Sequence, residues 1–199
     1  SITQNMAYAM RSMRFERVMY GSDYPDRSLR ETLEEDIYDW YKWFNDPDIT
    51  GYLFHGFKAN SLEEQKLFRE RHLTGKNGKL IFSIEDNKSK QLIGTCSINV
   101  DFMSPSKRAE ISMVIGSKKF HTGPLYFSIN KWLIDHSFKQ LNLNSLFAVT
   151  SEEHAVVRLT LERIGFKKVG KLRNTLYKDG KYLNSIYYDL LKDEWLKNQ

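Results

Sequence analysis

The stretch EISMVIGSKKFHTGPLYFSINKW, from Glu110 to Trp132, holds the residue types best suited to chemistry. It has the pattern of a strand, a short basic loop and an amphipathic helix, with Gly123 and Pro124 at the helix start. Unpaired N–H groups and the helix dipole both favour an anion at a helix N-terminus. The pattern therefore predicts a phosphate-binding loop. The alternative is an ordinary basic turn that caps a core helix.

The strand before this loop alternates in side-chain character, so its two faces differ. The face expected to enter the core comprises Ile111, Met113 and Ile115. Glu110 points to the other face and is the only acidic residue on the strand. It is either a functional carboxylate beside the anion site or a solvated residue paired with Arg108 or Lys107.

The elements that must position these residues follow from hydrophobic period and from cap and turn residues. The patterns predict strands at 14–20 and 27–33, helices at 32–45 and 61–73, strands at 79–86, 91–102 and 108–116, a helix at 124–140, a strand at 144–151, a helix at 152–165 and two final strands about the turn 178–181.

Several local signals support this order. Thr32 with Glu35, and Ser61 with Glu64, are spaced to form capping boxes at the first two helices. The run 144–151 does not alternate clearly, which is typical of a strand covered on both faces. A helix between strands 108–116 and 144–151 favours a parallel pairing there. We predict an α/β fold of the α+β type, with a mixed sheet flanked by helices and the loop at the carboxyl end of a strand.

Composition limits the class of protein. A chain of 199 residues with 41% hydrophobic content suits one domain over 1–199, with 1–27 a less certain N-terminal extension. No run approaches the roughly 20 apolar residues of a membrane span, and no secretory signal is expected, so we expect a cytoplasmic protein. A single cysteine, Cys96, and five scattered histidines predict neither a disulfide nor a metal site. The net charge of +5 suits an anionic ligand. Its even spread makes nucleic acid the least favoured ligand.

Several motifs in this order together resemble the GNAT superfamily of acyl-CoA-dependent N-acyltransferases. The likeness runs from about Ser28 to Trp195 and is strongest to the branch with ribosomal-protein alanine, spermidine and amino-sugar N-acetyltransferases. Its carriers are LRETLEEDIYDWYKWFNDPDIT, LIGTCSINV, RAEISMVIG with the loop and helix after it, FKQLNLNSLFAVTSEEHAVVRLTLERIGFKKVGKLR and YKDGKYLNSIYYDLL. The resemblance implies a mostly antiparallel sheet with one parallel, splayed step.

The resemblance also implies acetyl-CoA as the acyl donor and no metal. The family loop R/Q-x-x-G-x-G/A falls on Phe120 to Leu125, so Gly123 is retained while Phe120 and Leu125 depart from the pattern. Leu125 would crowd the pyrophosphate unless its side chain turns into the core. The residues implied to hold the cofactor are Met113, Val114, Ile115, Lys118, Lys119, Phe120, His121, Thr122, Gly123, Leu125 and His154. For His154, a solvated residue at a helix start is the alternative.

For catalysis, the resemblance places Glu110 where several members keep a carboxylate that accepts the proton of the amine, directly or through a water. Backbone N–H groups near Val114 and Ile115 would polarise the thioester carbonyl. Many members use a tyrosine of the last helix as general acid. That position is Leu161 here, and the sequence does not assign a substitute.

The acceptor in this family is usually selected by the first two helices and their loop. The aromatic residues there that could form an acceptor cleft are Trp43, Tyr52, Phe54 and His55; ordinary core packing is the alternative. The leading hypothesis is acetylation of a primary amine on a small molecule, such as a nucleotide-linked amino sugar. Acetylation of a protein N-terminus and a catalytically inactive binding protein are the alternatives. The sequence leaves a homodimer open.

Overall fold

The computed structural model describes residues 18–19, 27–53, 60–73, 75, 77–101 and 105–197. Its strands are β1 (Val18–Met19), β2 (Arg27–Arg30), β3 (Lys79–Asp86), β4 (Leu92–Val100), β5 (Arg108–Ile115), β6 (Ser145–Ser151), β7 (Lys167–Lys178) and β8 (Lys181–Leu191). Its α-helices are α2 (Asp36–Phe44), α3 (Pro47–Thr50), α4 (Leu62–His72), α5 (Gly123–Asp135), α6 (Ala155–Ile164) and α7 (Lys192–Lys197). A 3₁₀ turn, Lys118–Phe120, precedes α5, and a π-helical turn, His136–Gln140, follows it.

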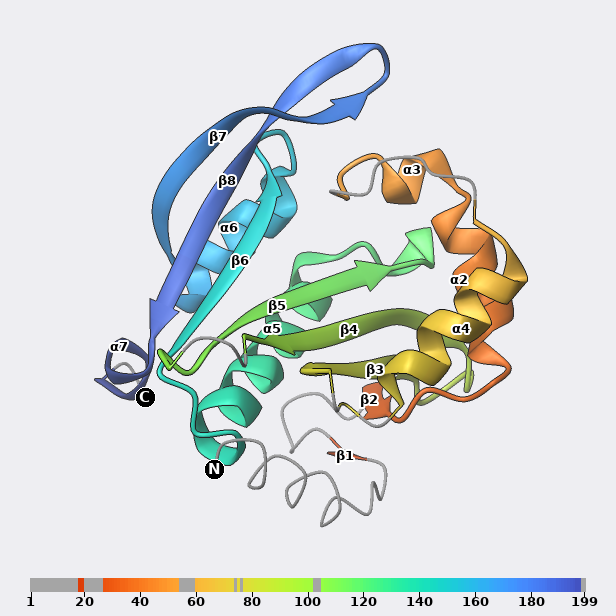
Figure 1. Cartoon of the computed structure of the whole chain (residues 1–199), viewed down its shortest axis with the longest axis horizontal. Coiled ribbons are helices and arrows are strands. Elements are labelled where there is room, and N and C mark those ends of the chain that lie inside the picture. Colours follow the sequence, from red (N-terminus) through yellow and green to blue (C-terminus); the bar gives the residue numbers. More distant parts are fainter. Residues whose placement is uncertain are drawn as a thin grey trace.

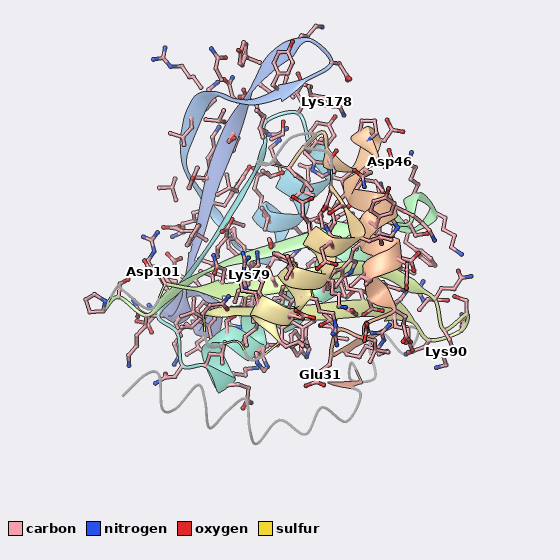
Figure 2. All side chains as sticks on the ribbon, turned by 45° about the vertical axis from the view of Figure 1, so that its right-hand side comes forward. Glu31, Asp46, Lys79, Lys90, Asp101 and Lys178 are labelled. Atoms are coloured by element: carbon pink, nitrogen blue, oxygen red, sulfur yellow. The ribbon has the colours of Figure 1, made fainter. Side chains whose placement is uncertain are left out.

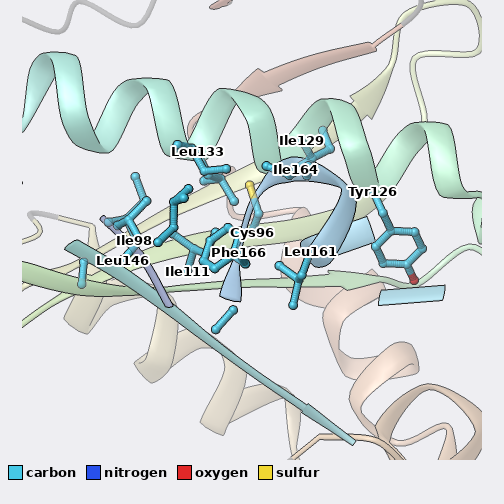
Figure 3. Packing of buried hydrophobic residues seen from close by; sticks show 14 of the residues in the cluster. Cys96, Ile98, Ile111, Tyr126, Ile129, Leu133, Leu146, Leu161, Ile164 and Phe166 are labelled. Atoms are coloured by element: carbon cyan, nitrogen blue, oxygen red, sulfur yellow. The ribbon is translucent and has the colours of Figure 1, made fainter. Parts of the chain in front are cut away.

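The strands form one mixed sheet in the order β1-β2-β3-β4-β5-β6-β8-β7, flanked by helices as predicted. In Figure 1, α2 and α4 lie in front of the sheet, and α5 and α6 lie behind it. The main core lies between the sheet and α5, where Ile129 and Leu133 pack with Ile98 and Ile111 (Figure 3). A smaller core around Trp40 lies under α2 and α4.

Local sequence signals account for most element boundaries. The capping box of α4 is present, because the Ser61 side chain accepts from the Glu64 N–H while the Glu64 carboxylate accepts from the Ser61 N–H. The β7–β8 turn has positive φ at Asp179 and Gly180, as a two-residue hairpin turn requires.

The prediction of a Thr32 cap is wrong. Helix α2 begins at Asp36, and its preceding residue makes no side-chain cap. Asp36 instead accepts from the Leu33 N–H and takes two hydrogen bonds from Arg30, which also binds Glu85 on β3. This buried cluster, which we call the Arg30 cluster, joins β2, α2 and β3. The short helices α3 and α7 were also not predicted.

Every strand pair is antiparallel except β5 and β6, which are parallel as predicted. They pair only over residues 108–110 and 145–147, so the remaining parts of the two strands diverge. The prediction that β6 is covered on both faces is wrong. Its burial alternates, with Phe147 and Val149 half-buried on the face of the sheet that also carries Glu110. We call the diverging region between residues 111–115 and 148–151 the splay.

Candidate active site

The loop between β5 and α5 lies at the carboxyl end of β5, beside the splay. The ring Nε2 of His121 lies 2.7 Å from the carbonyl oxygen of Ile115. Since a carbonyl only accepts, His121 Nε2 carries the proton and donates it there.

The first turn of α5 leaves backbone donors open. The Tyr126 N–H donates to the Thr122 carbonyl. Within the described residues, the N–H groups of Gly123 and Leu125 have no backbone acceptor, and Pro124 has no N–H. Two donors at this helix start are therefore available for an anion.

The loop lysines expected to attract phosphate contact other groups. Lys118 forms ion pairs with Asp46 and Asp48 at α3, which raise the pKa of the lysine. Lys119 lies over the ring of Phe120, and Phe120 packs against the main core. The ion pairs of Lys118 with Asp46 and Asp48 join the loop to α3.

The packing around the helix start suits both Leu125, which departs from the family pattern, and Gly123, which keeps it. Leu125 is buried in the main core, so its side chain leaves the front of the helix start clear. At Gly123, an added Cβ would have no atom within 4 Å. The residue borders a groove of about 430 Å³ between the start of α5 and α6. Val156 and Leu159, both exposed apolar residues of α6, line it together with Arg163.

Glu110 is half-buried on the sheet face opposite the main core, as expected from the alternation of β5. It lies opposite Asn99 of β4, which lies opposite Lys79 of β3. Burial lowers the pKa of Lys79, and the charge of Glu110 partly opposes this change. In the described part of the chain, Glu110 has no hydrogen bond or ion pair, so the predicted alternative pairing with Arg108 or Lys107 is absent. Arg108 instead pairs with Asp101 and lies over the Phe147 ring.

An aromatic row, formed by Tyr126, His154 and Tyr52, lies at the ends of β5 and β6. His154, just before α6, stacks on Tyr52 with ring centroids 4.7 Å apart and meets Tyr126 edge-on at 6.5 Å. On Tyr52, the Lys178 ammonium lies 3.8 Å from the ring centroid. Figure 2 shows Lys178 near the tip of the β7–β8 hairpin, above the α3 region. Burial, with the nearby charges of His121 and Lys178, lowers the pKa of His154 to about 4. His154 is therefore neutral near pH 7.

The structure brings some predicted site residues together and separates others. Tyr52, predicted to bind the acceptor, and His154, predicted to bind the cofactor, are in contact with each other. Trp43 is buried and packs on Gly116, where a Cβ would lie 1.9 Å from its ring.

The β5 residues predicted to hold the cofactor differ in burial. Ile115 is buried, whereas Met113 and Val114 are half-buried beside the splay. Phe54 and His55 lie outside the described residues.

Sequence reasoning missed three residues at this site, Tyr126, Arg163 and Lys178. Tyr126 follows the family loop directly but reads as one more apolar residue of α5. Lys178 belongs to a hairpin that is distant in sequence, so no local pattern connects it with Tyr52. Within the described ranges, no group of three or more His, Cys, Asp or Glu residues is placed to hold a metal ion. No helix described there is long and apolar enough to cross a bilayer.

Comparisons with known proteins agree with this arrangement. The sequence profile of the acetyltransferase (GNAT) domain matches residues 27–167. The uncharacterised N-acetyltransferase p20 of Bacillus licheniformis is 28% identical over 171 residues, which span 84% of this chain and 94% of that protein. The uncharacterised N-acetyltransferase YoaA of Bacillus subtilis is 25% identical over 168 residues, covering 82% and 92% of the two chains.

Among solved structures, the spermidine N-acetyltransferase of Vibrio cholerae, crystallised with CoA and spermine, superposes with a TM-score of 0.77. It is 22% identical, and the match covers 86% of this chain and 98% of that one. This likeness confirms the fold, with its parallel step and flanking helices. The profile match, the related N-acetyltransferases and the splayed sheet with an anion-ready helix start show that this chain is an acyltransferase of the GNAT family.

Proposed function

We propose that this protein transfers an acetyl group from acetyl-CoA to a primary amine of a small molecule. The observation that supports this most directly is the open start of α5 beside the splay, with Glu110 half-buried on the adjoining sheet face. Acyl transfer from coenzyme A to an amine needs a site for the phosphates of the donor and a group that accepts the amine proton, and the start of α5 and Glu110 are suited to these two tasks.

The residues present fit coenzyme A. The free N–H groups of Gly123 and Leu125, at the positive end of α5, suit its pyrophosphate. The groove next to them offers apolar contact from Val156 and Leu159, and Arg163 adds a cation for a phosphate. When bound, coenzyme A supplies the activated acyl group as a thioester.

Glu110 is the group proposed to accept the amine proton. Its carboxylate has no hydrogen bond among the described residues, so its lone pairs are available to the amine or to a bridging water. After Glu110, β5 still pairs with β4 but no longer with β6, so the backbone N–H groups near Val114 that face the splay are proposed to polarise the carbonyl of the acyl group.

The acceptor class follows from the aromatic row. The Lys178 ammonium lies over the outer face of Tyr52, and within this proposal an amine borne on an alkyl chain or sugar displaces it from that face. The structural neighbour from Vibrio cholerae acts on spermidine. A polyamine and an amino sugar carried on a nucleotide are the acceptors to compare. Acetylation of a protein N-terminus is the second candidate.

The test begins with calorimetric titration of the purified protein with acetyl-CoA. Transfer is then measured with spermidine, a nucleotide-linked amino sugar and a short peptide with a free N-terminus. Binding of acetyl-CoA with turnover of a small amine is the expected result. Absence of binding at millimolar acetyl-CoA overturns the proposal. Turnover of the peptide alone replaces it with the protein N-terminal activity.

A further inference from the structure

The departing thiolate of an acyl transfer must gain a proton, and the position at which many family members carry a tyrosine for this step is Leu161. Leu161 lies in the main core, with 2% of its surface exposed, and has no proton to give. The inference that follows rests on the proposed function, because it concerns the leaving group of the same reaction.

Tyr126 reaches the same region from the neighbouring helix. It lies in the first turn of α5, next to the groove residues Gly123 and Pro124, and belongs to the same core cluster as Leu161. Figure 3 shows its ring extending from α5 toward the sheet, and the ring contacts His154, which follows β6. The side chain is 6% exposed, and its hydroxyl makes no hydrogen bond to any described residue. The hydroxyl oxygen is not among the fully buried unpaired side-chain atoms of the described residues, so solvent or a ligand can reach it.

Aromatic rings lie along one side of Tyr126. His154 meets it edge-on, and Tyr52 covers the other side of His154. Burial raises the pKa of Tyr126, so the phenol stays protonated near neutral pH. The hydroxyl is thus kept in its proton-donating form at the side of the splay.

Other side chains near the splay are less suited to donate a proton. His154, with a pKa of about 4, is neutral. The His121 Nε2 proton is engaged by the Ile115 carbonyl. Ser112 shares its hydroxyl with Ser97 at 2.7 Å. The Tyr126 hydroxyl, by contrast, has no hydrogen-bond partner in the described part of the chain, so its proton is available.

We propose that Tyr126 is the general acid of this enzyme, supplied by α5 in place of α6. As the amine nitrogen bonds to the acyl carbon and the C–S bond breaks, the electron pair of that bond goes to sulfur. The Tyr126 hydroxyl gives its proton to this sulfur, and the amine proton goes to Glu110. The phenolate then regains a proton from Glu110 through water, or from solvent, so protons balance over one turnover.

The first test replaces Tyr126 by Phe, which keeps the ring packing and removes only the hydroxyl. We expect kcat to fall about a hundredfold, with little change in the calorimetric affinity for acetyl-CoA and in the thermal midpoint. Tyr177→Phe is the matched control, since Tyr177 is exposed on the hairpin and lies outside the site; its kcat should be unchanged. A Tyr126→Phe enzyme with parental kcat overturns the assignment.

The second test separates a chemical role from a structural one. With 3,5-difluorotyrosine at position 126, the phenol is more acidic, so the alkaline limb of the kcat–pH profile should move to lower pH. In Tyr126→Phe, this limb should disappear. An unmoved limb in the fluorinated enzyme means that Tyr126 only packs. Failure of the unaltered enzyme to turn over any amine would instead contradict the proposed function, which keeps the two failures distinguishable.

Discussion

At the scale of single residues, Glu110 is the proposed base, and its environment makes the role testable. Glu110→Gln keeps the shape but removes the proton acceptor, so kcat should fall about a hundredfold while acetyl-CoA affinity stays the same, because the cofactor groove lies elsewhere. The measurement is turnover against pH for a competent amine. Glu34→Gln, an exposed change on the surface, is the control. Near-parental turnover at neutral pH would make Glu110 a structural residue.

The second prediction at the residue scale concerns His154 and the pH dependence of the free energy of unfolding. Its folded pKa of about 4 lies below the unfolded value of about 6.5, so the unfolded state binds more protons between these limits. The free energy of unfolding should therefore fall as the pH drops from about 6.5 to 4. The rings of Tyr52 and Tyr126 face His154, and the side chains of His121 and Lys178 are close enough to influence its charge.

His154→Phe keeps a ring against Tyr52 but cannot titrate, so its thermal midpoint should depend less steeply on pH over this range. His136, whose pKa burial also lowers to about 4, contributes in the same window and remains in the variant. Part of the slope should therefore persist. Identical slopes in the variant and the unaltered protein would show that His154 does not titrate in the folded state as described.

At the scale of elements, the start of α5 and the groove beside it form the proposed cofactor site. Gly123→Val places a side chain in open space, so the thermal midpoint should not change, but the added atoms should project into the groove. We expect calorimetry to show at least tenfold weaker acetyl-CoA binding, about 1.4 kcal/mol. Gly170→Val is the matched control. A Cβ there also meets nothing within 4 Å, but Gly170 lies on β7 and does not line the groove. Equal affinities in both variants would place the cofactor elsewhere.

At the scale of the whole molecule, the Arg30 cluster holds α2 against β2 and β3 of the sheet. Arg30→Leu leaves the buried carboxylates of Asp36 and Glu85 without their cation, which should lower the free energy of unfolding by about 3–5 kcal/mol in urea titrations. Lys42→Leu breaks the exposed pair with Asp39 and should cost less than about 1 kcal/mol. A similar small loss in both variants would contradict the role given to the cluster.

Much of the fold could be predicted because its signals are local. Alternation marked β3, β4 and β5, and the Ser61 capping box marked the start of α4. The cap predicted at Thr32 failed because a long-range partner, Arg30 with Asp36, decides how α2 begins. The coverage predicted for β6 failed because the splay leaves one of its faces half-buried.

The candidate site divides in the same way. The sequence by itself determined the helix start at Gly123, the face of Glu110 and the absence of a tyrosine at Leu161, since each depends on residue type and on a period of a few residues. Only the tertiary structure decided that Lys118 binds α3, that Leu125 turns into the core and that Tyr126, His154 and Tyr52 form one row. Those contacts join segments far apart in the chain, and packing geometry alone selects them from the many pairings that the residue types permit.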